Sequence, residues 1–314
     1  MATATRNPEL FEEVACPACG GRRFTVEIPD RVPQGLTAEA VRRQFHSSSD
    51  HCFFEQLVRC EGCSLLFLNP RIRSDLILSG YSEAVDPVFA RQNELRIRTF
   101  TRGLRQAMKV TGMTPRSHSR VLDVGCAGGA FVKAATDLGF RATGVEPSRW
   151  LCELGREQYG LDLRPGILSD QNFAPRSFDL ITLWDVIEHL TDPGDVVEQI
   201  HGLLVDGGLF VVNYPDYGSL ARKILRRKWP FLLSVHLIYF TRKTIRKFLE
   251  ERGFEVLEIR PFWQTLELGY VLGRAGAYFG VFSTLARVVE RIGLGRIPCA
   301  YNMGQSTVIA RKRS

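Results

Sequence analysis

Two acidic residues and a glycine-rich turn stand at spacings that suit the binding of a nucleoside. Residues 121–129 (VLDVGCAGG) run from an apolar stretch into the turn at Gly125, with Asp123 two residues before it. Glycines at such a turn let the backbone approach a ligand where a Cβ would collide. A second apolar stretch ends at Glu146, about 20 residues further on, and a carboxylate there suits a pair of ribose hydroxyls. The pattern predicts a nucleoside-containing cofactor across the carboxyl ends of parallel strands.

The details of the turn separate two classes of cofactor. Nicotinamide enzymes use G-x-G-x-x-G, in which close backbone and a helix N-terminus hold a pyrophosphate. Here Ala127 occupies the position of the second glycine, and the carboxylate of Asp123 would repel a pyrophosphate. The same carboxylate suits a cofactor that carries an ammonium group, such as S-adenosylmethionine. The electrostatics of the turn therefore favour S-adenosylmethionine.

Four of the eight cysteines form two C-x-x-C pairs, Cys16 with Cys19 and Cys60 with Cys63. Because no apolar core of a secretory signal opens the sequence, the pairs predict metal binding rather than disulfides. Four thiolates fill a tetrahedral zinc ion and leave no open position for chemistry, so we expect a structural zinc site. The gap between the pairs exceeds the usual roughly 15–20 residues and indicates an inserted loop. That loop holds three conceivable alternative ligands, His46, His51 and Cys52.

Two histidines are candidates for the removal of a proton. His189 follows Glu188 after a predicted strand, and His236 lies three residues before Tyr239. Methyl transfer from a sulfonium mostly needs positioning, but an acceptor hydroxyl or acidic C–H must lose its proton, and histidine suits neutral pH. His189 or His236 is therefore a candidate base, with Tyr239 beside it as a further catalytic candidate, and loop packing is the alternative. A metal site of Glu188, His189 and His236 is a third interpretation, with few ligands.

Strands and helices must alternate to position these residues. From residue 120 onward the sequence has the pattern of a parallel α/β sheet. Strands are predicted at 120–125, 141–146, 161–164, 178–184, 208–213, 254–259 and 305–311. Helices are predicted at 128–138, 148–158, 192–204 and 241–252, with a hydrophobic helical stretch at about 266–293. Glycines such as Gly139 and Gly160 stand where helices should end.

Three units follow from this pattern. Residues 1–72 are predicted to form a zinc-binding unit, and residues 73–113 a helical linker or cap. Residues 114–314 form the α/β core. Two insertions of this core, at about 214–240 and 266–303, are expected on the substrate side.

The composition is that of an ordinary globular chain. Of its 314 residues, 45% are apolar and 24% are charged, and a cytoplasmic protein is expected. Only 12 uncharged residues separate Arg274 from Arg287, too few for the roughly 20 that span a bilayer.

The net charge of +7 is partly local. Basic residues crowd the run 221–233, which could hold phosphate groups, touch a membrane peripherally or form a simple lid helix. The stretch 266–293 suits core packing or the surface of a homodimer. No RNA-binding signature with interleaved aromatics is present, so no nucleic acid partner is expected.

Taken together, the motifs resemble class I S-adenosylmethionine-dependent methyltransferases. The resemblance covers about residues 14–265 and rests on four motifs, at 121–129, 144–146, 177–190 and 203–213. More narrowly, the C-x-x-C pairs and the H-x-x-Y-F-T element at 236–241 resemble a zinc-ribbon subgroup of sugar, polysaccharide and natural-product pathways. The fold this implies is α/β: a Rossmann-like, seven-stranded, mostly parallel sheet with helices on both faces, plus a small N-terminal zinc ribbon.

The resemblance also implies roles for individual residues. Asp123 and the backbone of Gly125 would hold the methionine moiety, Glu146 would accept both ribose hydroxyls, and Trp184 and Asp185 would lie beneath the sulfonium. The full set of implied cofactor-binding residues is Asp123, Gly125, Cys126, Gly129, Glu146, Leu168, Ser169, Trp184 and Asp185, with Leu168 or Ser169 near the adenine.

The activity implied is methyl transfer to a hydroxyl or activated carbon of a sugar, glycan or secondary-metabolite intermediate. A quinone- or phenol-type O-methyltransferase is the first alternative. The second is a non-catalytic S-adenosylmethionine-binding protein whose zinc ribbon docks a partner.

Overall fold

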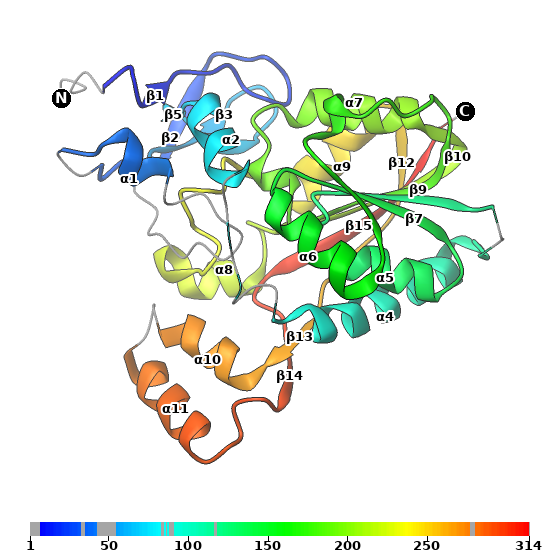
Figure 1. The fold of residues 1–314 in the computed structure, drawn as a ribbon. Helices are drawn as coiled ribbons and strands as arrows, with labels where there is room; N and C mark the ends of the chain where they lie inside the picture. Colours follow the sequence, from blue (N-terminus) through cyan, green and yellow to red (C-terminus); the bar gives the residue numbers. More distant parts are fainter. Residues whose placement is uncertain are drawn as a thin grey trace.

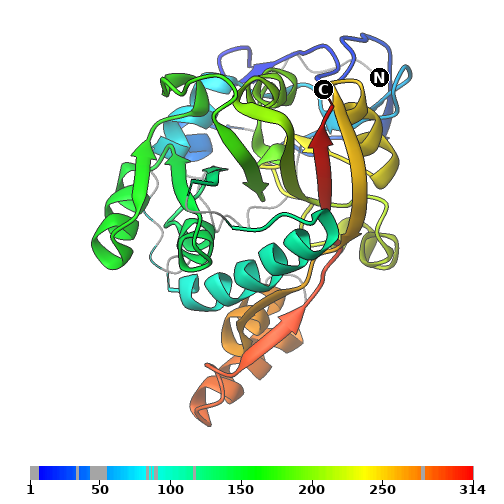
Figure 2. The same cartoon turned by 90° about the vertical axis from the view of Figure 1, so that its right-hand side faces the viewer.

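A seven-stranded sheet forms the centre of the molecule (Figure 1 and Figure 2). The computed structural model describes residues 7–32, 35–42, 55–82, 85, 87, 91–115, 118–276 and 280–313. Within them the strand order is β12-β15-β10-β9-β6-β7-β8. The bounds are β6 (Arg120–Val124), β7 (Arg141–Glu146), β8 (Asp162–Pro165), β9 (Phe178–Trp184), β10 (Leu204–Pro215), β12 (Phe254–Pro261) and β15 (Gln305–Lys312).

The strands from β8 to β10 pair in parallel, and β15 runs antiparallel to both β10 and β12. The predicted Rossmann-like, mostly parallel sheet is therefore confirmed. The parallel strands end at one edge, which brings the residues that follow β6, β7 and β9 together.

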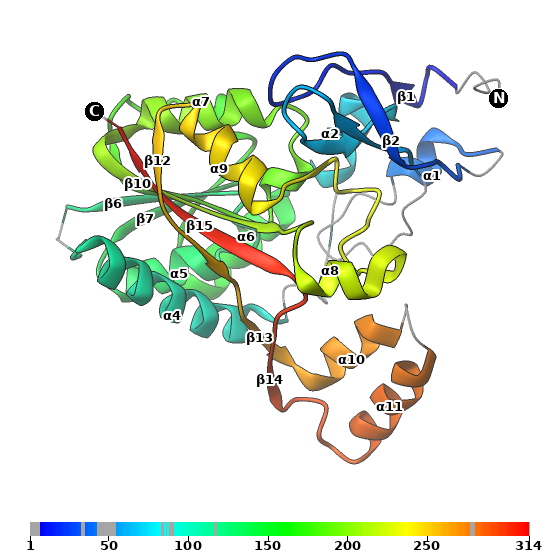
Figure 3. The same cartoon turned by 180° about the vertical axis from the view of Figure 1, so that it is seen from behind.

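Alternating side chains bury both faces of this sheet, since successive residues of a strand point to opposite sides. Val121 and Leu180 join one apolar cluster, whereas their neighbours Leu122 and Ile181 join another. Figure 3 shows α7 and α9 on one side of the sheet and α4 and α5 on the other. The helices are α4 (Asn93–Thr111), α5 (Ala130–Asp137), α6 (Arg149–Tyr159), α7 (Pro193–Leu203) and α9 (Arg242–Glu250).

Local capping residues set the bounds of these helices. The Ser148 side chain accepts a hydrogen bond from the Leu151 amide at the start of α6, and Thr241 caps α9 in the same way. Gly160 takes a left-handed conformation, with φ of 66°, and ends α6. Each cap is a local feature, because it depends on neighbours only a few residues away.

The N-terminal residues form a second sheet that a core segment completes. Its order is β11-β4-β3-β2, from β2 (Phe24–Ile28), β3 (Leu57–Cys60), β4 (Leu66–Leu68) and β11 (Ile238–Tyr239). The short strands β1 (Phe11–Glu12) and β5 (Arg71–Ile72) pair beside it, with α1 (Ala38–Arg42) and α2 (Ser74–Ser82) following in the chain.

Strand β11 comes from the predicted insertion at 214–240 and pairs with β4. Buried Arg71 also reaches the core, because its guanidinium donates to the Thr191 carbonyl at 2.8 Å. The N-terminal unit is therefore joined to the core at two places, the insertion at 214–240 and the loop at Thr191.

The second insertion forms a projecting hairpin of helices (Figures 1 to 3). Two strands, β13 (Gln264–Glu267) and β14 (Pro298–Tyr301), make its base, and α10 (Leu268–Gly276) and α11 (Gly280–Arg291) lie beyond them. The sequence predicted a helical stretch over 266–293 and missed both strands, because β13 depends on a partner some thirty residues away. None of the helices in the described ranges is long and apolar enough to cross a membrane.

Candidate functional site

A large cavity opens at the carboxyl ends of β6, β7 and β9, with a volume of about 480 Å³. Helix α4, the loop after β9, the loop over 230–236 and helix α10 supply its other walls. Eight of the nine predicted cofactor residues line it: Asp123, Gly125, Cys126, Glu146, Leu168, Ser169, Trp184 and Asp185. The parallel topology thus gathers residues that are far apart in the sequence.

The glycine turn requires its glycine at Gly125. This residue has φ of +73°, and a Cβ built on it would lie 2.4 Å from Cγ2 of Val186. The amides of Gly125 and Cys126 both donate to the Val145 carbonyl, at 2.8 and 3.0 Å, so the turn is bound to β7. Gly129 lies elsewhere: it precedes α5 and faces Leu161, not the cavity.

Two buried carboxylates stand on either side of this turn. Asp123 is 2% exposed and accepts a hydrogen bond from the Thr182 hydroxyl at 2.6 Å. Burial raises its pKa to about 8, and the nearby charge of Glu146 adds to the effect. Glu146 accepts from the amides of Ala127 and Ser148, both at 2.9 Å. Burial raises its pKa, and these two backbone donors oppose the rise.

The segment after β8 forms the next part of the wall. Residues Leu168–Asp170 make a short 3₁₀ helix, η1, in which Leu168 is buried and Ser169 is exposed. The Gly166 amide donates to the Glu146 carbonyl at 3.0 Å, so η1 is held next to the acidic residue. A flat base placed here would touch Leu168 and Ile167 while remaining open to water on one side.

Strand β9 delivers Trp184 and Asp185 to the floor of the cavity. The Trp184 ring packs on Phe100, Phe131 and Phe262, with centroids 5.0, 5.5 and 5.5 Å away. Asp185 has φ of 56°, an uncommon value outside glycine, and its Oδ1 accepts from the side-chain amides of Asn213 and Gln305. Packing and cavity contact thus coexist at Trp184.

The two histidines predicted as bases meet in the same cavity. Their ring centroids lie 4.7 Å apart, and His189 and His236 place Nδ1 2.8 Å from the carbonyls of Val235 and Phe231. A carbonyl only accepts, so Nδ1 carries the proton in each neutral ring. Burial lowers the pKa of His189 to about 4 and holds the pKa of His236 well below its usual range.

Glu188 completes a group of potential ligands. One ligand atom each from Glu188, His189 and His236 lies within 4.8 Å of the others. Burial raises the pKa of Glu188, and the Asp185 charge adds to this; its Oε2 is buried without a hydrogen-bond partner among the described residues. The geometry thus suits either a proton-accepting pair or a metal ligand set.

Tyr239 does not reach the cavity. It is 1% exposed, and its hydroxyl donates to the Leu233 carbonyl at 3.1 Å and accepts from the Leu233 amide at 3.2 Å. The structure thus places Tyr239 where it fixes the 230–236 loop that carries His236, and not among the residues lining the cavity.

Several cavity residues carried no signal in the sequence. Arg96 and Phe100 come from α4, Gln305 starts β15, and a further group comes from the loop and hairpin: Phe231, Gln264, Tyr270, Arg274 and Tyr301. An amphipathic pattern at 93–111 predicts a helix but not which of its residues meets a ligand.

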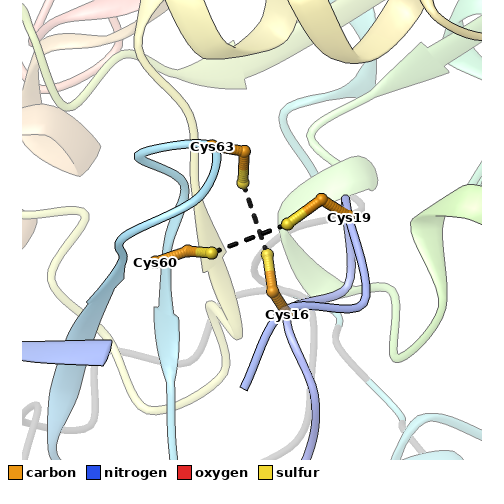
Figure 4. A group of neighbouring side chains, drawn as sticks. All are labelled: Cys16, Cys19, Cys60 and Cys63. Atoms are coloured by element: carbon orange, nitrogen blue, oxygen red, sulfur yellow. Dashed lines mark hydrogen bonds between the residues drawn. The ribbon is translucent and has the colours of Figure 1, made fainter. Parts of the chain in front are cut away.

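Four sulfur atoms converge in the N-terminal unit (Figure 4). The Sγ atoms of Cys16 and Cys63 are 3.5 Å apart, and those of Cys19 and Cys60 are 3.6 Å apart. The two C-x-x-C turns face each other across this point, as the sequence predicted. His46, His51 and Cys52, the alternative ligands, lie outside the described residues.

Fold and site define a methyltransferase. Residues 90–259, more than half of the chain, match the family model described as a methyltransferase domain, and the chain belongs to that family.

Individual relatives cover part of the chain. A ubiquinone biosynthesis O-methyltransferase of Caulobacter sp. (strain K31) is 33% identical over 108 residues, 32% of this chain and 42% of the relative. The mitochondrial protein of that name from Schizosaccharomyces pombe is 23% identical over 181 residues, 51% and 64% of the two chains. The chain thus spans less than two thirds of the length of these relatives. A solved S-adenosylmethionine-dependent methyltransferase from Archaeoglobus fulgidus aligns over 72% of this chain and 100% of its own, with 17% identity and a TM-score of 0.49.

The raised pKa of Asp123 predicts a pH-dependent stability. The folded protein holds this proton up to about pH 8, whereas a solvated aspartate releases it near pH 3.8. Stability from this residue is therefore complete below pH 3.8 and falls as the pH rises to 8. We expect Asp123→Asn to gain stability over the unchanged protein between pH 5 and pH 8, by an amount on the order of 3–4 kcal/mol.

Urea unfolding at pH 5 and pH 8 measures this difference. The exposed Asp137→Asn is the matched control and should show little change in its difference from the unchanged protein between the two pH values. An Asp123→Asn effect that is equal at both pH values would contradict the buried, protonated state.

Proposed function

We propose that the protein transfers the methyl group of S-adenosylmethionine to the hydroxyl of a phenol- or quinol-type acceptor. The observation that carries the proposal is the aromatic lining of the cavity beside the two neutral histidines. S-adenosylmethionine supplies an activated methyl group when bound, so the residues need only position the acceptor and take its proton.

The cofactor end of the cavity fits S-adenosylmethionine. The Asp123 carboxylate would face its ammonium group, and the cofactor's positive charge would favour the ionised form of the acid. Each Glu146 oxygen takes one backbone hydrogen bond and keeps acceptor capacity for a ribose hydroxyl. Leu168 and Ser169 would border the adenine, and Asp185 would lie near the sulfonium.

The acceptor end favours a flat apolar group over a sugar. Phe231, Leu266, Tyr270 and Tyr301 line it. Its amide side chains are engaged with one another: Gln264 donates to Gln305 at 2.7 Å, and Gln305 donates to Asp185. A sugar needs many polar partners, whereas an aromatic ring packs on other rings.

The relatives' names agree with this choice. Both refer to O-methylation in ubiquinone biosynthesis, which supports the quinone- or phenol-type alternative over the sugar or glycan acceptor that the narrower resemblance favoured.

The histidine pair is proposed to accept the proton of the acceptor. With Nδ1 donating to a backbone carbonyl, the basic nitrogen of each ring is Nε2. The low pKa values keep both rings neutral at pH 7, which is the form that takes up a proton. A proton gained by the histidines would in turn favour the ionised form of Glu188, whose pKa burial raises, so that a carboxylate would then face the imidazolium.

The four cysteines are proposed to hold one structural zinc ion. A Zn–S bond of 2.3 Å in a tetrahedron places sulfurs roughly 3.8 Å apart, close to the observed 3.5 and 3.6 Å. Such an ion would lock β3 and β4 to the first C-x-x-C turn, and through β11 it would support the loop that carries His236.

The role of Glu146 is tested by isothermal titration with S-adenosylmethionine. Glu146→Gln keeps the size of the side chain but replaces an acceptor by a donor, so the dissociation constant should rise roughly tenfold to a hundredfold. The exposed Glu153→Gln is the matched control. An unchanged dissociation constant in a folded Glu146→Gln would show that the ribose assignment is wrong.

The acceptor and the base are tested by mass spectrometry of the methylated product. A catechol should be methylated, and His189→Ala or His236→Ala should lower kcat by roughly 10² to 10⁴, with the exposed His118→Ala unchanged. Because the His189 pKa is about 4, the rate should not fall between pH 8 and pH 6.

Other results would overturn parts of this assignment. Methylation of sugars alone would refute the aromatic acceptor, and binding of S-adenosylmethionine without any product would favour the non-catalytic interpretation. Unchanged turnover in both histidine variants would remove the base. A requirement for added divalent cation would instead favour the metal ligand set of Glu188, His189 and His236.

The zinc proposal predicts one zinc ion per chain in native mass spectrometry. Cys60→Ser should lose the ion and lower the midpoint of thermal unfolding, whereas Cys299→Ser, outside the cluster, should change neither. Zinc-free protein with an unchanged midpoint would contradict a structural ion.

A further inference from the structure

The projecting hairpin leaves an apolar stripe exposed. Val281, Leu285, Val288 and Ile292 are 72%, 43%, 50% and 60% exposed. Their spacing of four, three and four residues places all of them on one line along α11 and its end. Figures 1 to 3 show the hairpin standing away from the central sheet, so the described body of the protein does not cover this line.

Cations border the stripe. Arg287, Arg291 and Arg296 are exposed, and Glu290 is the exposed acidic residue between them. At 100° per residue around the helix axis, Arg287 and Arg291 fall roughly 80–120° from Val281, the first residue of the stripe. Buried Val289 falls on the other side of the stripe from these arginines. An apolar line with arginines at its margin is typical of helices that lie in the interface of a membrane.

A second element repeats this combination. Helix α8 (Leu220–Leu225) exposes Leu220 by 71% and Ile224 by 69%, four residues apart. It leads into the 3₁₀ turn η3 (Arg226–Lys228), and the exposed cations of this segment are Lys223, Arg226, Arg227 and Lys228. Neither the two apolar residues nor these cations line the cavity.

Both elements continue directly into walls of the cavity. The chain leaves η3 and enters the cavity lining at Pro230 and Phe231. The other wall is α10, which packs on α11 and contributes Tyr270, Val271 and Arg274. A surface that bound both elements would therefore lie against the acceptor end of the cavity.

We propose that α11 and the α8–η3 segment dock the protein onto a membrane surface rich in anionic phospholipid. Apolar side chains would enter the headgroup boundary while the seven cations meet phosphate groups. A second copy of the chain fits less well, because pairing α11 with itself would bring two sets of arginines together. Docking would present the cavity to an acceptor dissolved in the lipid; this consequence rests on the proposed function, whereas the docking itself does not.

Co-sedimentation with vesicles tests the docking. The full chain, without cofactor or acceptor, should bind vesicles of phosphatidylcholine with phosphatidylglycerol at least roughly tenfold better than pure phosphatidylcholine. The double variant Leu285→Ser with Val288→Ser should lower the partition coefficient at least roughly tenfold. Arg287→Gln with Arg291→Gln should remove most of the preference for anionic lipid.

Matched controls lie on α4, away from both elements. Val110→Ser is the apolar control, and Arg102→Gln with Arg105→Gln is the charge control; all three positions are exposed. If these controls lose as much vesicle binding as the α11 variants do, the proposal is overturned. Such a result would show non-specific electrostatic or hydrophobic adsorption of the protein to the vesicles.

Three further results discriminate among outcomes. Equal binding to neutral and anionic vesicles, or none to either, would overturn the proposal. A dimer in sedimentation velocity that Leu285→Ser dissociates, without vesicle binding, would assign the stripe to a second copy. Vesicle binding that the α11 variants abolish, in a protein that methylates no acceptor, would support docking and refute the proposed function alone.

Discussion

The side chain of Glu146 holds two segments of the site together by hydrogen bonds. Its two carboxylate oxygens accept the amides of Ala127 and Ser148, so one group links the glycine turn after β6 to the start of α6. The amides of Gly125 and Cys126 bind β7 from the other direction. The turn that would hold a cofactor is thus fixed by hydrogen bonds across two neighbouring strands. Asp123 lies buried beside this arrangement, where burial and the charge of Glu146 raise its pKa and the Thr182 hydroxyl donates to it.

The features that depend on neighbours in the sequence were predictable. The parallel core strands and their helices followed from apolar spacing and from glycines such as Gly139 and Gly160, where helices should end. The cluster of four cysteines was predictable as well, because each C-x-x-C turn offers two thiolates by itself. Eight cofactor candidates line the cavity because the carboxyl ends of parallel strands always meet at one edge. Gly129 was the exception, since its packing against Leu161 decides its place.

The features that depend on distant partners were not predictable from the sequence. Strand β11 pairs with β4, and β13 pairs with β14 across the whole hairpin, and no local pattern announces either. The short spacing to His236 makes Tyr239 a catalytic candidate in the sequence, but its hydroxyl is bound to the backbone of Leu233 and Tyr239 is not among the residues that line the cavity. Arg96 and Tyr301 reach the acceptor end through tertiary packing alone.

The pairing of β11 with β4 gives one end of the cavity a support outside the central sheet. One end of the cavity stands on the central sheet, whereas the 230–236 loop at the other end is also attached to the N-terminal sheet through β11. Loss of structure in the cysteine unit should therefore disturb this loop more than it disturbs the glycine turn after β6. Under the proposed function, such a protein would still bind S-adenosylmethionine but would bind the acceptor less well. The same division would allow the loop to change in sequence without a change in the central sheet.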